Sequence, residues 1–337
     1  MTVQTRGEYL TMPLSRSTMS AQALEDAVGL RRVIASAGQF VALTKPRVMS
    51  LAVFTAFVGL WIAPRHLDFA GTSLALICIA LGAAAAGALN MWYDADIDAV
   101  MSRTASRPIA RGQRSPREAL TFGLVLGIAA TVGCAVTVNV TAAALLAFTI
   151  AYYAIVYTAW LKRRSPESIV IGGAAGALPP VIGWAATGSA FSSEPLLLFL
   201  ITFLWTPPHF WALALERSAD YARAGVPALP VVAGREETKR RILRYSLLLV
   251  VSSALPWALG YAGAVYAAAA ALLGIAFLGL AIKVRTSVEG PQARQLFAFS
   301  IFYLFALFAS LPVDQAVRSE RVSAEVEIAV ALNTVSR

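Results

Sequence analysis

Charged residues are scarce in this chain. Asp, Glu, Lys and Arg make up 14% of its 337 residues, while 58% are hydrophobic and the mean hydropathy is +0.67. Because soluble domains average roughly 25% charged residues, the chain lacks the residues to cover a water-facing surface. Cysteine is nearly absent as well. Cys78 and Cys134 both lie in apolar stretches, which excludes a disulfide framework and favours a role as small apolar residues.

The apolar stretches are long enough to cross a bilayer, for which a helix needs about 20 residues. In lipid every backbone polar group must be paired within its own segment, so these stretches are expected to be helices. The predicted spans are Val48–Ala63, Phe69–Trp92, two within Ala119–Leu161 divided at Asn139–Thr141, Ile169–Ser193, Pro195–Leu215, two within Tyr245–Ile282 divided at Gly260–Gly263, and Gln295–Val313. The sequence therefore predicts an all-α integral membrane protein of about nine transmembrane helices.

Basic residues are distributed unequally between the two sides of this topology. With a cytoplasmic N-terminus, all but four of the 28 Lys and Arg residues fall in cytoplasmic segments, the exceptions being Arg65, Arg318, Arg321 and Arg337. This positive-inside bias predicts a multi-pass membrane protein with a cytoplasmic N-terminus. The bacterial inner (plasma) membrane is its expected location. The net charge of +9 then reflects topology and contact with anionic lipid. Its dispersal over short loops argues against nucleic-acid binding.

Three regions are predicted along the chain: a polar cytoplasmic extension at 1–40, the membrane domain at 41–315 and a short tail at 316–337. The extension has no apolar core long enough for a signal peptide. The alternative location, the mitochondrial inner membrane, is disfavoured because Glu8, Glu25 and Asp26 interrupt the acid-poor pattern of a transit peptide. The tail is expected to be amphipathic or disordered.

Three polar residues at regular spacing follow the second predicted span. Asn90, Asp94 and Asp98 stand at i, i+4 and i+8, so a continuing helix would place them on one face. Carboxylates placed in this way repel each other unless a cation lies between them, and Mg²⁺ binds one or two carboxylates together with phosphate oxygens. The alternative is an acidic helix end solvated by water. At a membrane boundary rich in arginine we favour the metal-site interpretation.

A second acidic pair, Glu216 and Asp220, ends the sixth predicted span on the same side of the membrane. Two such pairs are what a diphosphate held by two or more Mg²⁺ ions requires. The predicted metal ligands are Asp94, Asp98, Glu216 and Asp220. The candidates to neutralise the remaining phosphate charge are Arg103, Arg107 and Lys162.

These motifs resemble those of the UbiA superfamily of intramembrane prenyltransferases, in which Asn-x3-Asp-x3-Asp and an Arg-Pro segment precede a second acidic motif four helices later. Within it, the chain looks like the protohaem IX farnesyltransferase (haem O synthase) family over about residues 40–315. The matching stretches are Leu43–Val48, Tyr157–Arg164, Ile169–Trp184, Trp205–Trp211 and Asp220–Val231. The acidic motif specifies only the superfamily, whereas the His-Phe-Trp and Asp-Tyr segments point to haem.

The resemblance implies a fold of nine helices around a central cavity. It also implies transfer of a farnesyl group from farnesyl diphosphate to a vinyl group of haem B, with water addition, giving haem O for a terminal oxidase. Mg²⁺ is the implied cofactor. The implied catalytic residues are Asn90, Asp94, Asp98 and Asp220. The implied substrate-binding residues are Lys45, Arg47, Arg103, Arg107, Tyr157, Lys162, His209 and Tyr221. Binding of haem A synthase or an oxidase assembly protein is left open.

Some positions depart from the family pattern. Ala219 stands where the family usually has an acid, Ser168 where Asn is common and Ala228 where Met is usual. Glu216 is an acid where the farnesyltransferases often have an uncharged residue, which puts its carry-over as a metal ligand in doubt.

His209 lies in the sixth predicted span, where an ionisable residue is a functional candidate. It can bind haem iron or orient a water through its neutral imidazole, or it can pack between helices, and the resemblance favours function. Tyr157, Trp205 and Tyr221 are candidates to stabilise a carbocation through their ring faces. Packing between helices is the more common role for such residues.

Two other function classes are considered. Another UbiA-type prenyltransferase, acting on a quinone precursor or a chlorophyll-like acceptor, would share the diphosphate site, so only the segments around His209 and Asp220 discriminate. A transporter would place polar groups and broken helices near the membrane midplane. This chain places its acids at the cytoplasmic boundary instead, so we predict a prenyltransferase.

Overall fold

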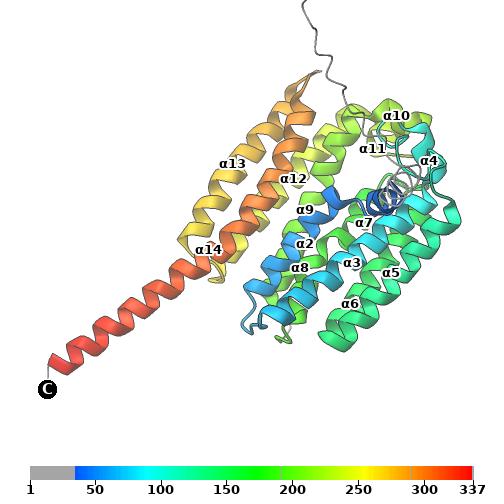
Figure 1. Ribbon diagram of the computed structural model, residues 1–337. Coiled ribbons are helices and arrows are strands. Elements are labelled where there is room, and N and C mark those ends of the chain that lie inside the picture. The colour runs from blue at the N-terminus through cyan, green and yellow to red at the C-terminus, as the bar shows by residue number, and fades with distance from the viewer. Residues whose placement is uncertain (1–34, 191, 289, 336–337) are drawn as a thin grey trace, which may run out of the picture.

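The computed structural model describes residues 35–190, 192–288 and 290–335, with side chains described as far as Glu320. Throughout these residues the regular structure is helical, which confirms the all-α prediction (Figure 1). The labelled elements are α2 (Pro46–Trp61), α3 (Phe69–Tyr93), α4 (Ala95–Val100), α5 (Pro116–Thr137), α6 (Val140–Ala151), η1 (Tyr152–Leu161), α7 (Ser168–Ala177), α8 (Pro179–Ala186), α9 (Ser193–Glu216), α10 (Ser218–Arg223), α11 (Leu229–Val232), α12 (Gly234–Ala258), α13 (Ala264–Thr286) and α14 (Gln292–Val335).

Most of the long helices can cross a membrane. In the described part of the chain, seven are long and apolar enough, and there are eight if the helix Ala35–Leu43 and α2, which meet at 54°, are one span. α12 is a further long helix packed between α9 and α13, but its first turns are charged up to Arg244. The predicted count of nine is therefore approximate, and α12 accounts for the difference. The chain is a multi-pass membrane protein.

The turns predicted to divide the long uncharged stretches lie between helices. Asn139 separates α5 from α6, and its side chain accepts a hydrogen bond from the Ala142 amide at 2.8 Å. Its amide group also donates to the carbonyl oxygens of Ala185 and Ala186, both at 2.9 Å, at the end of α8. One side chain thus satisfies backbone groups that two helix ends leave unpaired. Gly260, with φ of +80°, begins the turn between α12 and α13.

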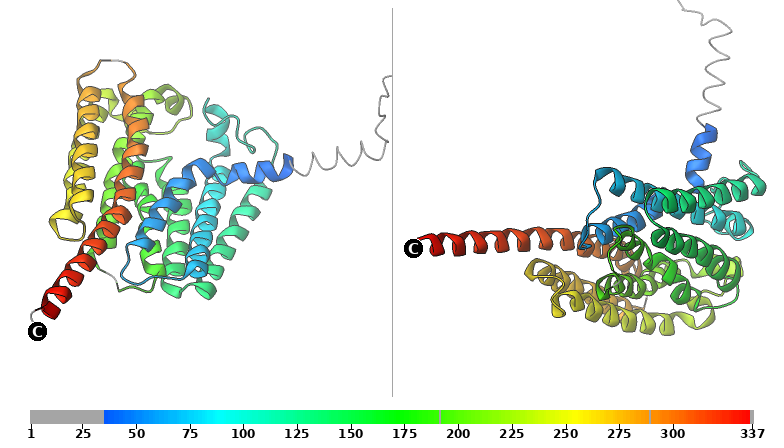
Figure 2. Two further views of the ribbon diagram at one scale, coloured as in Figure 1. Left: turned by 60° about the vertical axis from the view of Figure 1, so that its left-hand side comes forward. Right: turned by 90° about the horizontal axis from the view of Figure 1, so that it is seen from below.

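Small residues let two helices of the bundle approach closely. A Cβ added at Gly59 of α2 would lie 2.1 Å from the carbonyl oxygen of Pro180, and one added at Gly183 of α8 would lie 2.0 Å from that of Ala56. Backbone contact of this kind is typical of helix packing in membranes. The two views of Figure 2 show the helices as one bundle, from which α14 extends well beyond the others.

The connections that carry the two acidic motifs lie at the same end of the bundle (Figure 1). Ile97, Met101 and Val226 form a small buried cluster against which Tyr221 and Ala224 pack. This cluster joins the segment around α4 to the segment around α10. The turn between α12 and α13 lies at the opposite end of the bundle. The fold therefore brings together two motifs that are more than 100 residues apart in the sequence.

Candidate active site

The first acidic motif straddles the end of a transmembrane helix. α3 ends at Tyr93, Asp94 has φ −90° and ψ 11°, and α4 begins at Ala95, so the predicted continuous helix is interrupted at Asp94. The hydrogen-bond register nevertheless continues, because the Asp94 amide donates to the Asn90 carbonyl at 2.9 Å and the Asp98 amide to the Asp94 carbonyl at 2.8 Å. The Asn90, Asp94 and Asp98 side chains are all buried.

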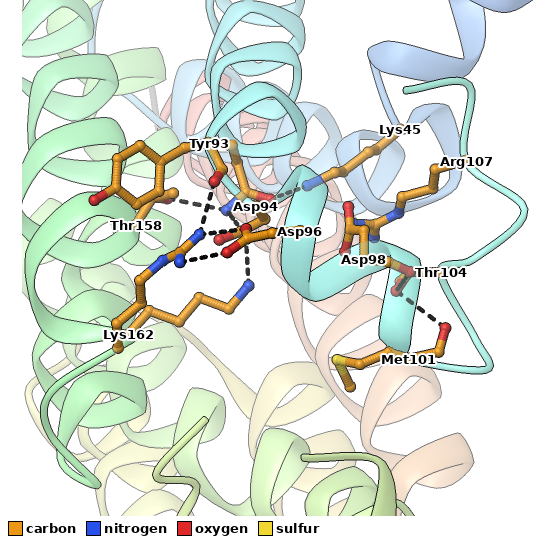
Figure 3. Close-up of polar contacts among 12 residues, drawn as sticks. Lys45, Tyr93, Asp94, Asp96, Asp98, Met101, Thr104, Arg107, Thr158 and Lys162 are labelled. Atoms are coloured by element: carbon orange, nitrogen blue, oxygen red, sulfur yellow. Dashed lines mark hydrogen bonds and ion pairs between the residues drawn. The ribbon is translucent and has the colours of Figure 1, made fainter. Parts of the chain in front are cut away.

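Asn90 and Asp94 belong to one polar network, and Figure 3 labels Asp94 together with three other members, Lys45, Thr158 and Lys162. The Asn90 Nδ2 donates to Asp94 Oδ2 at 2.8 Å and to Thr158 Oγ1 at 3.0 Å. The Lys45 ammonium donates to Asn90 Oδ1, and the Lys162 ammonium forms an ion pair with Asp94 Oδ2. Two predicted substrate-binding lysines, from distant parts of the sequence, therefore lie on either side of the first motif.

Lys45 has an unusual backbone. With φ 52° and ψ 56° it is left-handed, and no other non-glycine residue in the described part of the chain has a positive φ. It lies at the bend between the helix Ala35–Leu43 and α2, immediately before Pro46, which itself disfavours a right-handed helical conformation at Lys45. A left-handed conformation costs a residue other than glycine about 1–2 kcal/mol. Such strain is concentrated at functional sites.

One oxygen of the motif has no partner. Asp94 is fully buried, and its Oδ1 atom lacks a hydrogen-bond partner among the described residues. A buried carboxylate oxygen left unpaired is costly. Carboxylate and amide oxygens are the ligands that Mg²⁺ and similar hard cations prefer. The site therefore offers an open ligand atom of the type that such a cation takes.

Asp98 and Asp96 face different partners. Asp98 accepts from Arg107 Nη1 at 2.6 Å, and both side chains are largely shielded from solvent. Asp96 is exposed, and Arg163 bonds both of its oxygens at 2.7 and 2.8 Å (Figure 3). The hydrogen bond from Arg163 is the main reason that the pKa of Asp96 is lowered. Asp98 is thus buried against Arg107, whereas the exposed Asp96 binds the half-buried Arg163.

The second acidic motif does not form the predicted pair. α9 ends at Glu216, Arg217 leaves the helical conformation with φ −113°, and α10 begins at Ser218. As a result Glu216 is exposed, while Asp220 is buried. Asp220 accepts a hydrogen bond from Ser102 at 2.5 Å and forms an ion pair with Arg223. The Ser102 hydroxyl is the main cause of the lowered pKa of Asp220.

The four predicted metal ligands do not form a single cluster. Within the described residues, no three His, Cys, Asp or Glu side chains lie close enough to hold one metal ion. The reason is that each buried acid faces its own partners: Lys162 for Asp94, Arg107 for Asp98, and Ser102 with Arg223 for Asp220. Glu216 faces solvent.

Four further predicted substrate-binding residues are either exposed or half-buried. Arg103 is exposed and lies close to the half-buried Tyr221, whose pKa is raised by burial, an effect that the Arg103 charge opposes. Tyr157 is half-buried, and its ring lies where a Cβ at Gly172 would be. Arg47, in the first turn of α2, is exposed.

His209 is enclosed by aromatic rings. Its imidazole stacks on Trp205 at 4.3 Å and on Phe297 at 4.6 Å between ring centroids. Its Nδ1 is hydrogen-bonded to the Ser300 hydroxyl at 2.6 Å, which links α9 to α14. The ring is therefore held in the packing between two helices, the arrangement expected of the packing alternative.

Ser102 and Thr158 are among the residues of the site that were not predicted. Ser102 lies four residues after Asp98, and Thr158 lies four residues before Lys162. Ser102 lies beyond the end of α4, so helical spacing from Asp98 does not identify it, whereas Thr158 lies on η1 four residues before its C-cap Lys162 and shares a face with it. A hydroxyl group alone carries too little chemical signal to have been chosen among the many Ser and Thr residues of the chain.

Comparisons with known proteins identify the family to which the chain belongs. Residues 52–307 match the model of the UbiA prenyltransferase family. The chain is 55% identical to a protohaem IX farnesyltransferase of Mesorhizobium japonicum, over 87% of the chain and 94% of the relative. It is 57% identical to one of Parvibaculum lavamentivorans, over 83% and 89% respectively.

Solved structures share the fold at low sequence identity. A UbiA homolog from Aeropyrum pernix K1 superimposes with a TM-score of 0.66 at 19% identity, covering 80% of this chain and 98% of the homolog. A UbiA homolog from Archaeoglobus fulgidus, bound to DMAPP and Mg²⁺, gives a TM-score of 0.61 at 17% identity, covering 82% and 99%.

Proposed function

The chain belongs to the UbiA prenyltransferase family, and from this premise we propose that it transfers a farnesyl group from farnesyl diphosphate to a vinyl group of haem B. Water is added in the reaction, and the products are haem O and diphosphate. The observation that carries the acceptor assignment is the 55% identity, over 94% of its length, to a relative named for farnesylation of protohaem IX. Transfer to a quinone precursor is the alternative, and no relative cited here favours it.

Asp94 is the central residue of the proposed diphosphate site. Its open Oδ1, together with the buried Asp98 of α4 and Asp220 of α10, would hold divalent cations such as Mg²⁺. When bound, such cations supply positive charge to the leaving diphosphate. The Archaeoglobus homolog of the same fold binds Mg²⁺ together with a prenyl diphosphate, which supports this assignment. Glu216 is exposed and is the weakest of the four proposed ligands.

Three basic residues of the site already bind the three residues of the first motif. Lys45, Lys162 and Arg107 are bound to Asn90, Asp94 and Asp98. In the proposed complex these groups also donate to diphosphate oxygens, because each ammonium has three N–H donors and the guanidinium has five, more than the contacts to the motif use. Donors held in place before the reaction stabilise charge without reorganisation.

The chemistry follows from the substrates. The allylic C–O bond of farnesyl diphosphate breaks and its electron pair leaves with diphosphate. The vinyl carbon of haem then forms a C–C bond to the farnesyl group, and water adds to the resulting cation with loss of a proton. Tyr153 and Tyr157, whose ring centroids are 5.2 Å apart, present aromatic surface beside the first motif. Such faces stabilise positive charge.

The proposed setting is the inner membrane of a bacterium, with the N-terminus and the acidic motifs on the cytoplasmic side. The catalytic unit is residues 41–315, and 1–40 and 316–337 lie outside it. Haem A synthase and oxidase assembly proteins are candidate partners with which the product would be exchanged.

The test is a direct assay. Purified protein in detergent is incubated with haem B, farnesyl diphosphate and Mg²⁺, with an EDTA control, and the products are identified by mass spectrometry. The expected product is a haem heavier by one farnesyl group plus water, formed only with the metal. Prenylation of a hydroxybenzoate or quinone precursor in place of haem would overturn the acceptor assignment and leave the diphosphate site standing.

A further inference from the structure

We propose that Thr158 is a positioning residue: its hydroxyl fixes the Asn90 amide, which in turn aims the carboxylate of Asp94 at the cation of the diphosphate site. This inference rests on the proposed function, because it assumes that a divalent cation binds at Asp94. Thr158 is fully buried and lies on η1, whereas Asn90 and Asp94 lie at the end of α3.

Every polar atom of the Asn90 side chain is engaged. The carbonyl oxygen accepts from the Lys45 ammonium, which is only a donor, and Nδ2 donates to the Asp94 carboxylate, which is only an acceptor when ionised. This chemistry fixes which end of the amide is which. The remaining N–H of Nδ2 is bound by Thr158 at 3.0 Å. The Thr158 hydroxyl is therefore the third hydrogen-bond partner, after Lys45 and Asp94, that prevents the Asn90 amide from rotating.

The unusual geometry of η1 places Thr158 in this position. η1 is a π-helix of ten residues, and the Lys162 amide donates to the carbonyl of Tyr157, five residues earlier. The π-helix is rare, and the single turns of it that occur within α-helices are often found at functional sites. In an α-helix of 3.6 residues per turn, Tyr153 and Lys162, nine residues apart, point to opposite sides. In a π-helix, residues four and five apart share a face, which brings Tyr153, Tyr157, Thr158 and Lys162 to one side.

Loss of the hydroxyl has a defined consequence. Without an acceptor at Thr158, one N–H of Asn90 is buried and unpaired, and the amide is free to rotate away from Asp94. Asp94 Oδ2 then loses its 2.8 Å hydrogen bond, and the orientation of the open Oδ1 is no longer set. Removal of groups that orient a metal ligand typically lowers metal affinity about 10- to 100-fold.

The test compares variants that differ by one hydroxyl group. Thr158→Ala and Thr158→Ser are purified in detergent, and Mn²⁺ is titrated into each in the presence of farnesyl diphosphate. The free Mn²⁺ signal is followed by electron paramagnetic resonance. Thr202→Val is the matched control, because Thr202 is a buried threonine whose hydroxyl, among the described residues, bonds only to the Leu198 carbonyl of its own helix. We expect at least a tenfold weaker Mn²⁺ affinity in Thr158→Ala, with near-normal affinity in Thr158→Ser and in the control.

Equal Mn²⁺ affinity in Thr158→Ala and Thr158→Ser would overturn the proposal. If Thr158→Ala does not fold, Thr158→Val, which keeps the volume and removes the hydroxyl, takes its place in the comparison. Failure of the proposed function is distinguishable: a wild-type protein that binds Mn²⁺ and farnesyl diphosphate but does not modify haem refutes the acceptor, and leaves the Thr158 result intact.

Discussion

Asp94 and Asp314 are two buried aspartates at opposite ends of the same helical bundle. Asp314 of α14 accepts hydrogen bonds from the amides of Gly263, Val265 and Tyr266 at 2.5, 3.0 and 3.2 Å, and so completes the N-terminus of α13. Asp94 is as deeply buried, yet its Oδ1 has no partner among the described residues.

This difference distinguishes a carboxylate that is buried to stabilise the fold from one that is buried to serve a site. A helix leaves its first amides unpaired and carries partial positive charge at that end, so a carboxylate there is stabilised by the fold alone. The three backbone amides that bind Asp314 account for its burial. Asp94 is held by Asn90 and Lys162 on one oxygen and is open on the other, which the fold alone does not explain. We therefore predict that substitution of Asp94 lowers activity, whereas substitution of Asp314 lowers stability.

The largest expected effect is on catalysis. Asp94→Asn keeps the size of the side chain and removes its charge, so we expect the protein to remain folded in detergent and to lose at least about a hundredfold in turnover, as when a single charge-stabilising group is removed. Farnesylated haem formed per mole of protein is the readout. Wild-type turnover in this variant would remove the proposed metal site.

Asp314→Ala should act on stability instead. Three backbone amides at the start of α13 lose their acceptor, and an unpaired buried group costs about 1–3 kcal/mol. We expect a lower thermal midpoint, with turnover per folded molecule close to that of the wild type. Loss of turnover without a change in the thermal midpoint would contradict a purely structural role for Asp314.

His209→Ala is expected to have an intermediate effect. The ring fills the space between Trp205 and Phe297 and bonds to Ser300, so its removal leaves a cavity and an unpaired hydroxyl. We predict a lower thermal midpoint and equal weakening of haem and prenyl diphosphate binding, measured separately by fluorescence quenching and by isothermal titration. Selective loss of haem binding would instead show that His209 contacts the acceptor.

Glu216→Gln should have the smallest effect. Its side chain is exposed at the end of α9, and surface substitutions usually change stability by less than about 0.5 kcal/mol. We expect kcat and its dependence on Mg²⁺ to stay within about twofold of the wild-type values, because the charge of a solvent-exposed carboxylate interacts only weakly with the rest of the protein. A large shift in the Mg²⁺ dependence would show instead that Glu216 contributes to the metal site as strongly as the buried acids do.

The sequence was sufficient for the features that depend on local pattern. The apolar stretches predicted the spans, and Asn139 and Gly260 predicted turns between them because each has a specific backbone role. The spacing of Asn90, Asp94 and Asp98 predicted their register, which is kept even though the helix is interrupted at Asp94.

Other features depend on tertiary structure and were not predictable. Glu216 and Asp220 share a face only if the helix continues, and Arg217 leaves the helical conformation. The π-helix of η1 differs from an α-helix by one residue in each hydrogen-bonded ring, a difference for which residue types give little signal. The left-handed conformation of Lys45 follows from the bend before Pro46 rather than from lysine itself.

The most direct test of the contrast is Mn²⁺ binding and thermal unfolding of Asp94→Asn and Asp314→Ala, measured in one detergent with farnesyl diphosphate present. The account predicts that Asp94→Asn loses Mn²⁺ binding and keeps its thermal midpoint, and that Asp314→Ala keeps Mn²⁺ binding and unfolds at a lower temperature. Mn²⁺ binding at wild-type affinity in Asp94→Asn would contradict it.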